Sequence, residues 1–218
     1  SKYSLRYIID EGRKVRVQKI VFTGNPSLKS RDIIKAMTTK QRGWTLLWKA
    51  VPWYRKGAYS QDTLADDLAR VERYCQNYGF IEAKAVLDSV SYNEKRDRVI
   101  TYINLSEGTK YRVGSLSFEG NEKITTPKLN KALVLKPGQI YSADQADKTL
   151  ENLYTIYTEE GFIYCRVIPE PDLHDAVADL KYSILENNPA HVRQVIIAGN
   201  TKTRDKVIRR ELRIYEQD

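Results

Sequence analysis

The apolar residues of this 218-residue chain change their spacing several times, and the changes mark predicted strands and helices. Residues 15–22 alternate with a period of two, which is typical of a strand. The alternation slips by one residue between Val17 and Ile20, so we expect a β-bulge there. Residues 60–78 instead carry apolar residues at steps of four, three, four and three, which predicts a helix with one buried stripe. The stripe consists of Leu64, Leu68, Val71, Cys75 and Tyr78.

The same succession of elements occurs twice and then begins a third time. Each first strand ends in a Gly-Asn pair, which suits a turn that needs positive φ; the pairs start at Gly24, Gly120 and Gly199. Each long helix ends at a glycine, Gly79 or Gly161, that follows a serine by 19 residues. Two strands of a hairpin close each unit, predicted at 83–92 with 98–105 and at 165–168 with 178–185.

A short helix lies between each Gly-Asn turn and the long helix. Ser30, Thr126 and Thr203 are its predicted N-caps, because a hydroxyl side chain can accept a hydrogen bond from the first helical turn. The element order of one module is therefore β-α-α-β-β, and the chain is an array of such modules. Its predicted divisions are the last strand of a preceding module (1–12), two complete modules (13–109 and 110–188) and the start of a further one (189–218).

Composition and charge exclude several classes of function. The net charge of +8 comes from basic residues scattered among acids, so we expect no nucleic-acid partner. No run of 18 apolar residues occurs, so no helix is expected to span a membrane. Cys75 and Cys165 are predicted to be buried thiols. The two histidines, His174 and His191, lack neighbours at metal-ligand spacing, and we expect neither enzymatic activity nor a metal or cofactor.

Three recurrent motifs carry a resemblance to a known family. A β-α-α-β-β unit with Gly-Asn after its first strand, Tyr78-Gly79-Phe80 after its second helix and Glu107-Gly108 at its end resembles the POTRA domain of Omp85 proteins. The resemblance extends over the whole chain and implies an α+β fold, in which two helices cover one face of a three-stranded mixed sheet. The two complete modules are most similar to the third and fourth of five such domains, and the last segment to the start of the fifth.

The resemblance also implies a function. POTRA domains of this kind lie at the periplasmic face of the Gram-negative outer membrane, to which a C-terminal β-barrel outside this chain would tether them. They would receive unfolded outer-membrane proteins and dock accessory lipoproteins, without a cofactor. Two alternatives stay open: the POTRA region of a secretion transporter or autotransporter-assembly relative, and a structural module such as that of a division protein. Tandem repeats argue against the last, which carries a single unit.

The first candidate site is a sheet edge. In POTRA domains the second strand lies at an edge, where unpaired backbone groups can accept another strand by β-augmentation. In the second module this strand contains Pro169 and Pro171, and proline cannot donate to a β-ladder, so the first module is the better acceptor. Alternatively, its residues are ordinary strand residues without a partner. The candidates are Ala85, Leu87, Val90, Ser91 and Tyr92.

The second candidate site is an insert in the first module. The distance from Gly24 to Gly79 is 14 residues longer than that from Gly120 to Gly161, and all three tryptophans of the chain, Trp44, Trp48 and Trp53, lie in this stretch. They either form an exposed apolar patch for a partner or for the membrane, or fold over the core of their own module.

Overall fold

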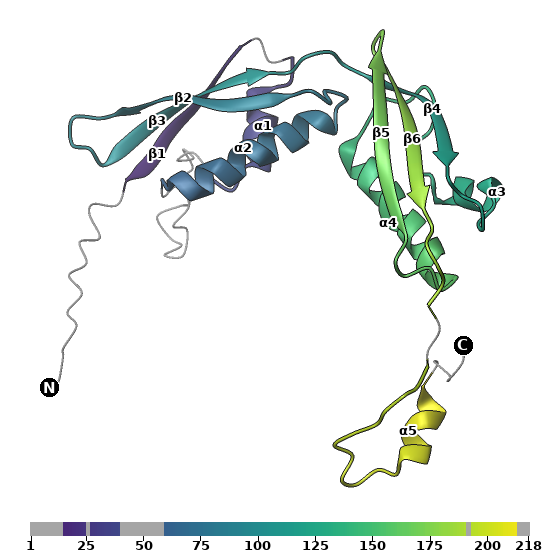
Figure 1. Ribbon diagram of the computed structural model, residues 1–218. Coiled ribbons are helices and arrows are strands. Elements are labelled where there is room, and N and C mark those ends of the chain that lie inside the picture. The colour runs from purple at the N-terminus through teal and green to yellow at the C-terminus, as the bar shows by residue number, and fades with distance from the viewer. Residues whose placement is uncertain (1–14, 25–26, 40–58, 191–192, 213–218) are drawn as a thin grey trace, which may run out of the picture. The chain divides into compact units, whose positions relative to one another are not determined.

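The computed structural model describes residues 15–24, 27–39, 59–190 and 193–212 (Figure 1). The predicted strand in residues 1–12 and the tryptophans Trp44, Trp48 and Trp53 lie outside the described residues. Compactness divides the chain into two units, Ser1–Tyr111 with Ile140–Ala143, and Arg112–Gln139 with Asp144–Asp218. Each unit contains one three-stranded sheet.

The first module has the order β1-α1-α2-β2-β3. β3 is the central strand of its sheet, with β1 parallel on one side and β2 antiparallel on the other. Both helices lie on one face of this sheet (Figure 1). The bounds are β1 Arg16–Thr23, α1 Ser30–Ala36, α2 Gln61–Gln76, β2 Lys84–Tyr92 and β3 Arg98–Ser106.

The second module repeats this arrangement with the sheet order β4-β6-β5. Its elements are β4 Arg112–Glu119, α3 Thr126–Leu129, the 3-10 helix η2 Asn130–Ala132, α4 Ala143–Glu159, β5 Arg166–His174 and β6 Val177–Leu185. A last helix, α5 Asp205–Glu211, follows the third Gly-Asn pair. The structure confirms the predicted α+β fold, with two mixed sheets that each carry helices on one face.

The core of the first module lies between the sheet and α2. Val71 and Cys75 of α2 are fully buried, as are Ile103 and Leu105 of β3, and burial of such side chains is the main force that holds the layers together. The predicted stripe fails at its last position, because Tyr78 is 44% exposed. α2 ends at Gln76, so Tyr78 lies in the following turn and no longer keeps the helical spacing.

The predicted bulge of the first strand is confirmed, and the first strand of the second module has a bulge as well. The register of β1 shifts between Val17 and Lys19, and that of β4 between Val113 and Leu116. In β4 the bulge is built around Gly114: a Cβ atom there would lie 2.2 Å from Oδ1 of Asp179, so no other residue fits without displacement. The same oxygen accepts hydrogen bonds from the backbone N–H and the hydroxyl of Ser115, and these bonds lower the pKa of Asp179.

The predicted N-caps are wrong. Lys29, Thr125 and Arg204 occupy these positions, each without a hydrogen bond from its side chain to the helix. Ser30 and Thr126 are instead the first helical residues. In the two complete modules, a carboxylate from the end of the last strand binds N–H groups of the loop before this helix, so the entry to the helix is fixed from outside it.

That carboxylate is Glu107 in the first module and Glu186 in the second, only 8% and 7% exposed. Glu107 accepts hydrogen bonds from the backbone N–H groups of Ser27 (2.7 Å) and Leu28 (3.2 Å) and from the Ser27 hydroxyl (2.6 Å). Glu186 accepts from the N–H groups of Lys123 (2.7 Å) and Ile124 (3.2 Å). The glutamate that marks the end of each module in the sequence thus ties the last strand to the loop after the first strand.

Candidate protein-binding site

The second strand of each complete module lies at an edge of its sheet. This strand is β2 in the first module and β5 in the second. All five candidate residues, from Ala85 to Tyr92, belong to β2. An edge strand has backbone groups that no neighbouring strand pairs, and these can accept a further strand. Which groups of β2 point outward therefore decides what the edge can bind.

The hairpin end of β2 sets the direction of its backbone groups. The N–H of Asn93 donates to the carbonyl of Arg98 (3.1 Å), so Asn93 faces β3. Backbone groups of an antiparallel strand point alternately toward and away from the partner. Ser91 consequently faces β3, whereas the N–H and C=O groups of Val90 and Tyr92 point outward.

At the other end of β2, one outward group is already bound. The N–H of Ala85 donates to Oε1 of Glu72 on α2 (3.0 Å), so Ala85 faces away from β3, and by alternation so does Leu87. A bulge between Leu87 and Ser89 inserts Asp88 and reverses the alternation. Four of the five predicted residues therefore point their backbone outward, and three of them, Leu87, Val90 and Tyr92, have no hydrogen-bond partner for these groups among the described residues.

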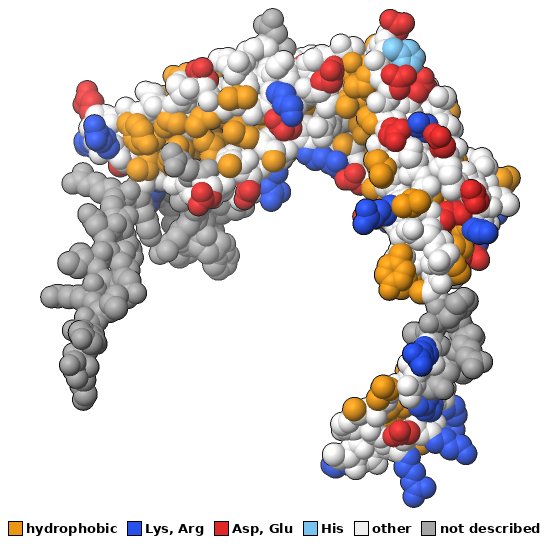
Figure 2. Space-filling model, viewed as in Figure 1, with side chains coloured by type: hydrophobic (Ala, Val, Ile, Leu, Met, Phe, Trp, Pro, Cys, Tyr) orange, Lys and Arg blue, Asp and Glu red, His pale blue; other side chains and the backbone are white. Residues whose placement is uncertain are grey.

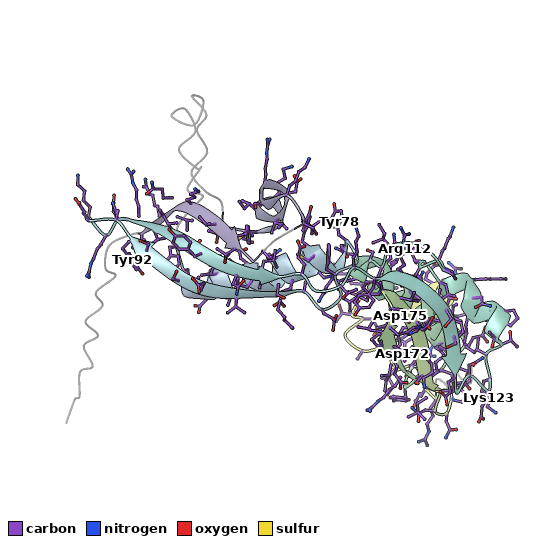
Figure 3. All side chains as sticks on the ribbon, turned by 90° about the horizontal axis from the view of Figure 1, so that it is seen from above. Tyr78, Tyr92, Arg112, Lys123, Asp172 and Asp175 are labelled. Atoms are coloured by element: carbon purple, nitrogen blue, oxygen red, sulfur yellow. The ribbon has the colours of Figure 1, made fainter. Side chains whose placement is uncertain are left out.

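The side chains of these residues differ in how far they are exposed to solvent. Ala85 is buried, Leu87 and Val90 are half-buried against the core, and Tyr92 is 50% exposed at the hairpin end of the strand (Figure 3). Burial and the neighbouring Tyr92 raise the pKa of the Tyr59 hydroxyl. Hydrophobic side chains gather where Figure 1 shows the sheet of the first module (Figure 2). A strand added at β2 would thus meet free main-chain groups beside an apolar surface.

In the second module, the corresponding outward group is also bound by the helix. The hydroxyl of Tyr154 on α4 accepts from the N–H of Val167 (3.1 Å) and lies 3.4 Å from the carbonyl of the same residue. Tyr154 and Glu72 each precede the helix-ending glycine by seven residues, and Val167 and Ala85 each follow it by six. Equivalent positions thus cover the start of both edges.

The direction of Val167 explains the two prolines. By alternation from Val167, Pro169 and Pro171 also point their nitrogen outward, where no ladder hydrogen bond is lost. β5 therefore continues to His174 with unbroken register, whereas the sequence prediction ended this strand at Ile168. The consequence for binding is that β5 lacks two of its outward N–H donors.

One signal for the edge of β2 was missed in the sequence. The apolar residues of β2 keep a period of two up to Leu87 and resume it at Val90, one residue late. The same kind of slip predicted the bulge of β1. In β2 the bulge shifts the alternation by one residue, so that Ser91 faces β3 while Val90 and Tyr92 point outward. Glu72 had no such signal, because its contact with Ala85 depends on how α2 packs beside β2.

Several titratable side chains of the described residues are buried. Asp67 is buried and accepts hydrogen bonds from the N–H groups of Thr38 (2.5 Å) and Thr39 (2.8 Å). Both cysteines are free and buried, and burial raises the pKa of Cys75 to about 11. Within the described ranges, no cluster of three or more His, Cys, Asp or Glu side chains could hold a metal ion.

The hairpin of the second module carries the one histidine that the described ranges contain. Nε2 of His174 lies 3.4 Å from Asp179, and Nδ1 lies 3.9 Å from Asp172. Acidic side chains surround this hairpin in Figure 2, and Asp172 and Asp175 mark it in Figure 3. None of the described helices has the length and apolar character needed to cross a bilayer.

Comparison with known families defines the class of the protein. The POTRA family, described as a surface antigen variable number repeat, matches residues 15–108 and again residues 111–187. The chain therefore belongs to the POTRA family, and each matched range contains one β-α-α-β-β module.

Among the curated relatives are two proteins called outer membrane protein assembly factor BamA. The protein from Neisseria meningitidis serogroup B is 29% identical over 212 residues, which cover 95% of this chain and 26% of the relative. The protein from Nitratidesulfovibrio vulgaris is 26% identical over 217 residues, which cover 96% of this chain and 26% of the relative. The chain thus spans about a quarter of the length of these relatives.

Two solved structures share the fold. POTRA domains 3–5 of Haemophilus influenzae BamA superpose with a TM-score of 0.73 at 22% identity, covering 96% of this chain and 81% of that one. BamA from Haemophilus ducreyi lacking POTRA domains 1–3 superposes with a TM-score of 0.60 at 14% identity, covering 81% of this chain and 30% of that one.

Proposed function

We propose that this chain is the periplasmic POTRA region of an outer-membrane protein assembly factor, tethered to the Gram-negative outer membrane by a barrel. It binds unfolded β-barrel proteins and docks accessory lipoproteins by β-augmentation at β2. The two modules correspond to the third and fourth domains of the array, with limits at 13–109 and 110–188. Membership of the POTRA family and the names of the similar proteins support this role.

The observation that carries the proposal is the row of outward backbone groups at Leu87, Val90 and Tyr92, which have no hydrogen-bond partner in the described ranges and whose direction is inferred from the ladder of β2 and β3. A ligand strand that pairs with these groups uses its own main chain, so its affinity depends only weakly on its side chains. This property suits a protein that receives many different β-barrel clients.

The difference between the two sheet edges supports binding at the first module only. β5 has the same position in its sheet but carries proline at 169 and 171, and its start is covered by Tyr154. Natural proteins use proline to keep an edge strand from pairing with other strands. The array therefore offers β2 and protects β5.

The proposal is tested by replacing Val90 in the full-length protein. Val90→Pro removes one outward N–H group but no hydrogen bond to β3. The proline ring also hinders the approach of an added strand at that position. We expect at least a tenfold weaker affinity for a urea-denatured outer-membrane β-barrel protein, measured by fluorescence anisotropy after dilution. Loss of one hydrogen bond accounts for about 1 kcal/mol, and loss of pairing beyond it for the rest.

Val90→Ala is the matched control, because it shortens the same side chain but keeps the N–H group. It should bind the denatured client nearly as well as the natural protein. Circular dichroism establishes that both variants are folded. A folded Val90→Pro protein with unchanged affinity would refute binding at this edge.

A further inference from the structure

The two modules differ sharply on the sheet face that their helices leave uncovered. In the first module, register and alternation place Val21, Ile100 and Tyr102 on this face, opposite the buried Val99 and Ile103. Counted from the turn glycine and from the terminal glutamate, the equivalent residues of the second module are Ser117, Asp179 and Lys181. The same positions are thus apolar in one module and polar or charged in the other.

The apolar residues of the first module form a continuous centre across the sheet. Val21 of β1 is the register partner of Tyr102 on β3, and Ile100 lies two residues before Tyr102 on the same face. Val86 of β2 adds a side chain that is 60% exposed. Serines 89 and 91 of β2 are the register partners of Tyr102 and Ile100. This open face therefore offers an apolar centre with short hydroxyl side chains beside it.

Basic residues flank this centre. Arg16, Lys19, Lys84 and Arg98 alternate onto the same face, and all four are exposed. Among the described residues, Arg16, Lys19 and Lys84 have no ion-pair partner, and Arg98 makes only a 4.0 Å contact with Asp97.

The second module balances the charges of its open face internally. Nζ of Lys181 lies 3.0 Å from Glu119 and 2.9 Å from Glu170, and the hydrogen bond from Lys181 lowers the pKa of Glu170. The carboxylate of Asp179 is bound by Ser115. Ile168 and Leu185 also expose apolar surface on this face (56% and 58%), but the charged residues beside them are paired. The open face of the first module differs in combining an apolar centre with cations that have no such partners.

We propose that the open face of the first module, formed by Val21, Val86, Ile100 and Tyr102 with the flanking cations, binds an acidic amphipathic helix of a partner protein. A sheet with an apolar face buries it against a helix in most two-layer folds. Carboxylates beside the apolar stripe of such a helix would meet Arg16, Lys19, Lys84 and Arg98. This surface is distinct from the β2 edge, because it uses side chains and leaves the outward backbone groups free.

The test uses a designed helical peptide as the probe. The peptide has 18 residues with Leu at positions i, i+3, i+4 and i+7, Glu beside them and Ala elsewhere. It is titrated by isothermal calorimetry into the 218-residue protein. We expect binding that weakens as salt rises from 50 to 300 mM, because exposed charge pairs are screened. A peptide with Lys in place of every Glu should bind at least tenfold more weakly.

Two variants locate the site. The triple variant Val21→Ser, Ile100→Asp and Tyr102→Lys gives the first module the residues that the second module carries at the same positions. A second variant, Arg16→Glu with Lys19→Glu, changes exposed charges alone and keeps the apolar centre. Both should remain folded by circular dichroism, and both should lower the affinity for the acidic peptide at least tenfold.

Other outcomes would overturn the proposal. Unchanged affinity of the acidic peptide in both folded variants would place its site elsewhere, and equal binding of the Lys peptide would remove the role of charge. Val90→Pro serves as the control for the edge, so a loss of peptide binding in that variant alone would mean that the peptide pairs with β2. Vesicles of phosphatidylcholine and phosphatidylglycerol (3:1) are tested in parallel. Binding to vesicles but not to the peptide would identify a lipid surface and refute the protein helix.

Discussion

Buried carboxylates at Glu107 and Glu186 are held by backbone N–H groups. An ionised carboxylate that leaves water without partners is strongly destabilising, and hydrogen bonds from N–H groups offset this cost. Here they also connect the end of one strand with a loop about 80 residues earlier in the first module. A single residue per module therefore closes the fold of that module.

The first prediction concerns the hydrogen bonds that Glu107 accepts from this loop. Glu107→Gln keeps the shape of the side chain but removes the negative charge and one of the two acceptor oxygens. We expect the free energy of unfolding in urea to fall by about 2 kcal/mol, because hydrogen bonds to a charged group contribute about 1.5–3 kcal/mol. Glu94→Gln, at an exposed position of the β2–β3 hairpin, should change it by less than about 0.5 kcal/mol. Equal effects of the two substitutions would contradict the role of Glu107.

A buried hydroxyl in β3 gives the second prediction. Oγ1 of Thr101 has no hydrogen-bond partner in the described part of the chain, although the residue is only 1% exposed. The second module has Leu180 at the equivalent position. Thr101→Val replaces the hydroxyl with a methyl group of the same size and should raise the free energy of unfolding by about 1 kcal/mol. Thr101→Ser keeps the hydroxyl, loses a methyl group and should lower it by a similar amount, so a stability loss in both variants would argue against an unpartnered hydroxyl.

The third prediction follows from the buried thiols. Burial raises the pKa of Cys75 to about 11, and the charges of Glu107 and Glu72 act in the same direction. A group whose pKa is raised on folding stabilises the fold fully below its ordinary pKa and loses this contribution as pH rises toward the folded value. Stability should therefore decline between about pH 9 and 11. Iodoacetamide at pH 8 should modify Cys75 and Cys165 only at the rate of unfolding, and rapid labelling of the folded protein would contradict this.

At the scale of elements, the sequence predicts a strand or helix correctly where one face of that element is buried along its length. Alternation in β1 and the helical stripe of α2 each report one buried face, so these elements and the bulge near Val17 were predictable. The position of β2 at an edge came from the family resemblance, because spacing along a strand does not show which strands are its neighbours.

Two features could not be predicted from the sequence: the continuation of β5 past its prolines and the entry of the chain into α1. Pro169 and Pro171 usually end a strand, and only their outward direction in an edge strand permits β5 to continue. The entry to α1 likewise depends on Glu107, a residue from the far end of the module. Contacts between distant segments decide both cases, and no local pattern records them.

The fourth prediction restores the missing donors of β5. Pro169→Val with Pro171→Thr returns two outward N–H groups to an edge strand without altering its register with β6. An unprotected edge tends to pair with other chains, so we expect concentration-dependent self-association by sedimentation velocity or a gain in client binding. Pro137→Ala, in an exposed loop before α4, is the control and should remain unchanged. A monomeric double variant without client binding would show that the prolines do not protect this edge.

At the scale of the whole molecule, each module is stabilised by its own residues. Each has its own sheet, its own helix layer and its own buried glutamate. The two compact units of the chain follow the modules except that Tyr111 and Ile140–Ala143 belong to the first unit. Stability is then a property of each module, and a core substitution in one should leave the unfolding of the other in place.

The position of the tryptophans permits a direct test of this independence. All three lie between residues 44 and 53, within the first unit, so we expect indole fluorescence to report on that unit, whereas far-ultraviolet circular dichroism follows both. Leu153→Ala in the fully buried core of α4 should cost the second module about 2–5 kcal/mol and shift part of the dichroism transition in urea, while the indole transition keeps its midpoint. Ile103→Ala in the first core should shift the indole transition instead. If both probes shift together in both variants, the two modules unfold as one cooperative unit, and binding at the β2 edge would then depend on the stability of the second module as well.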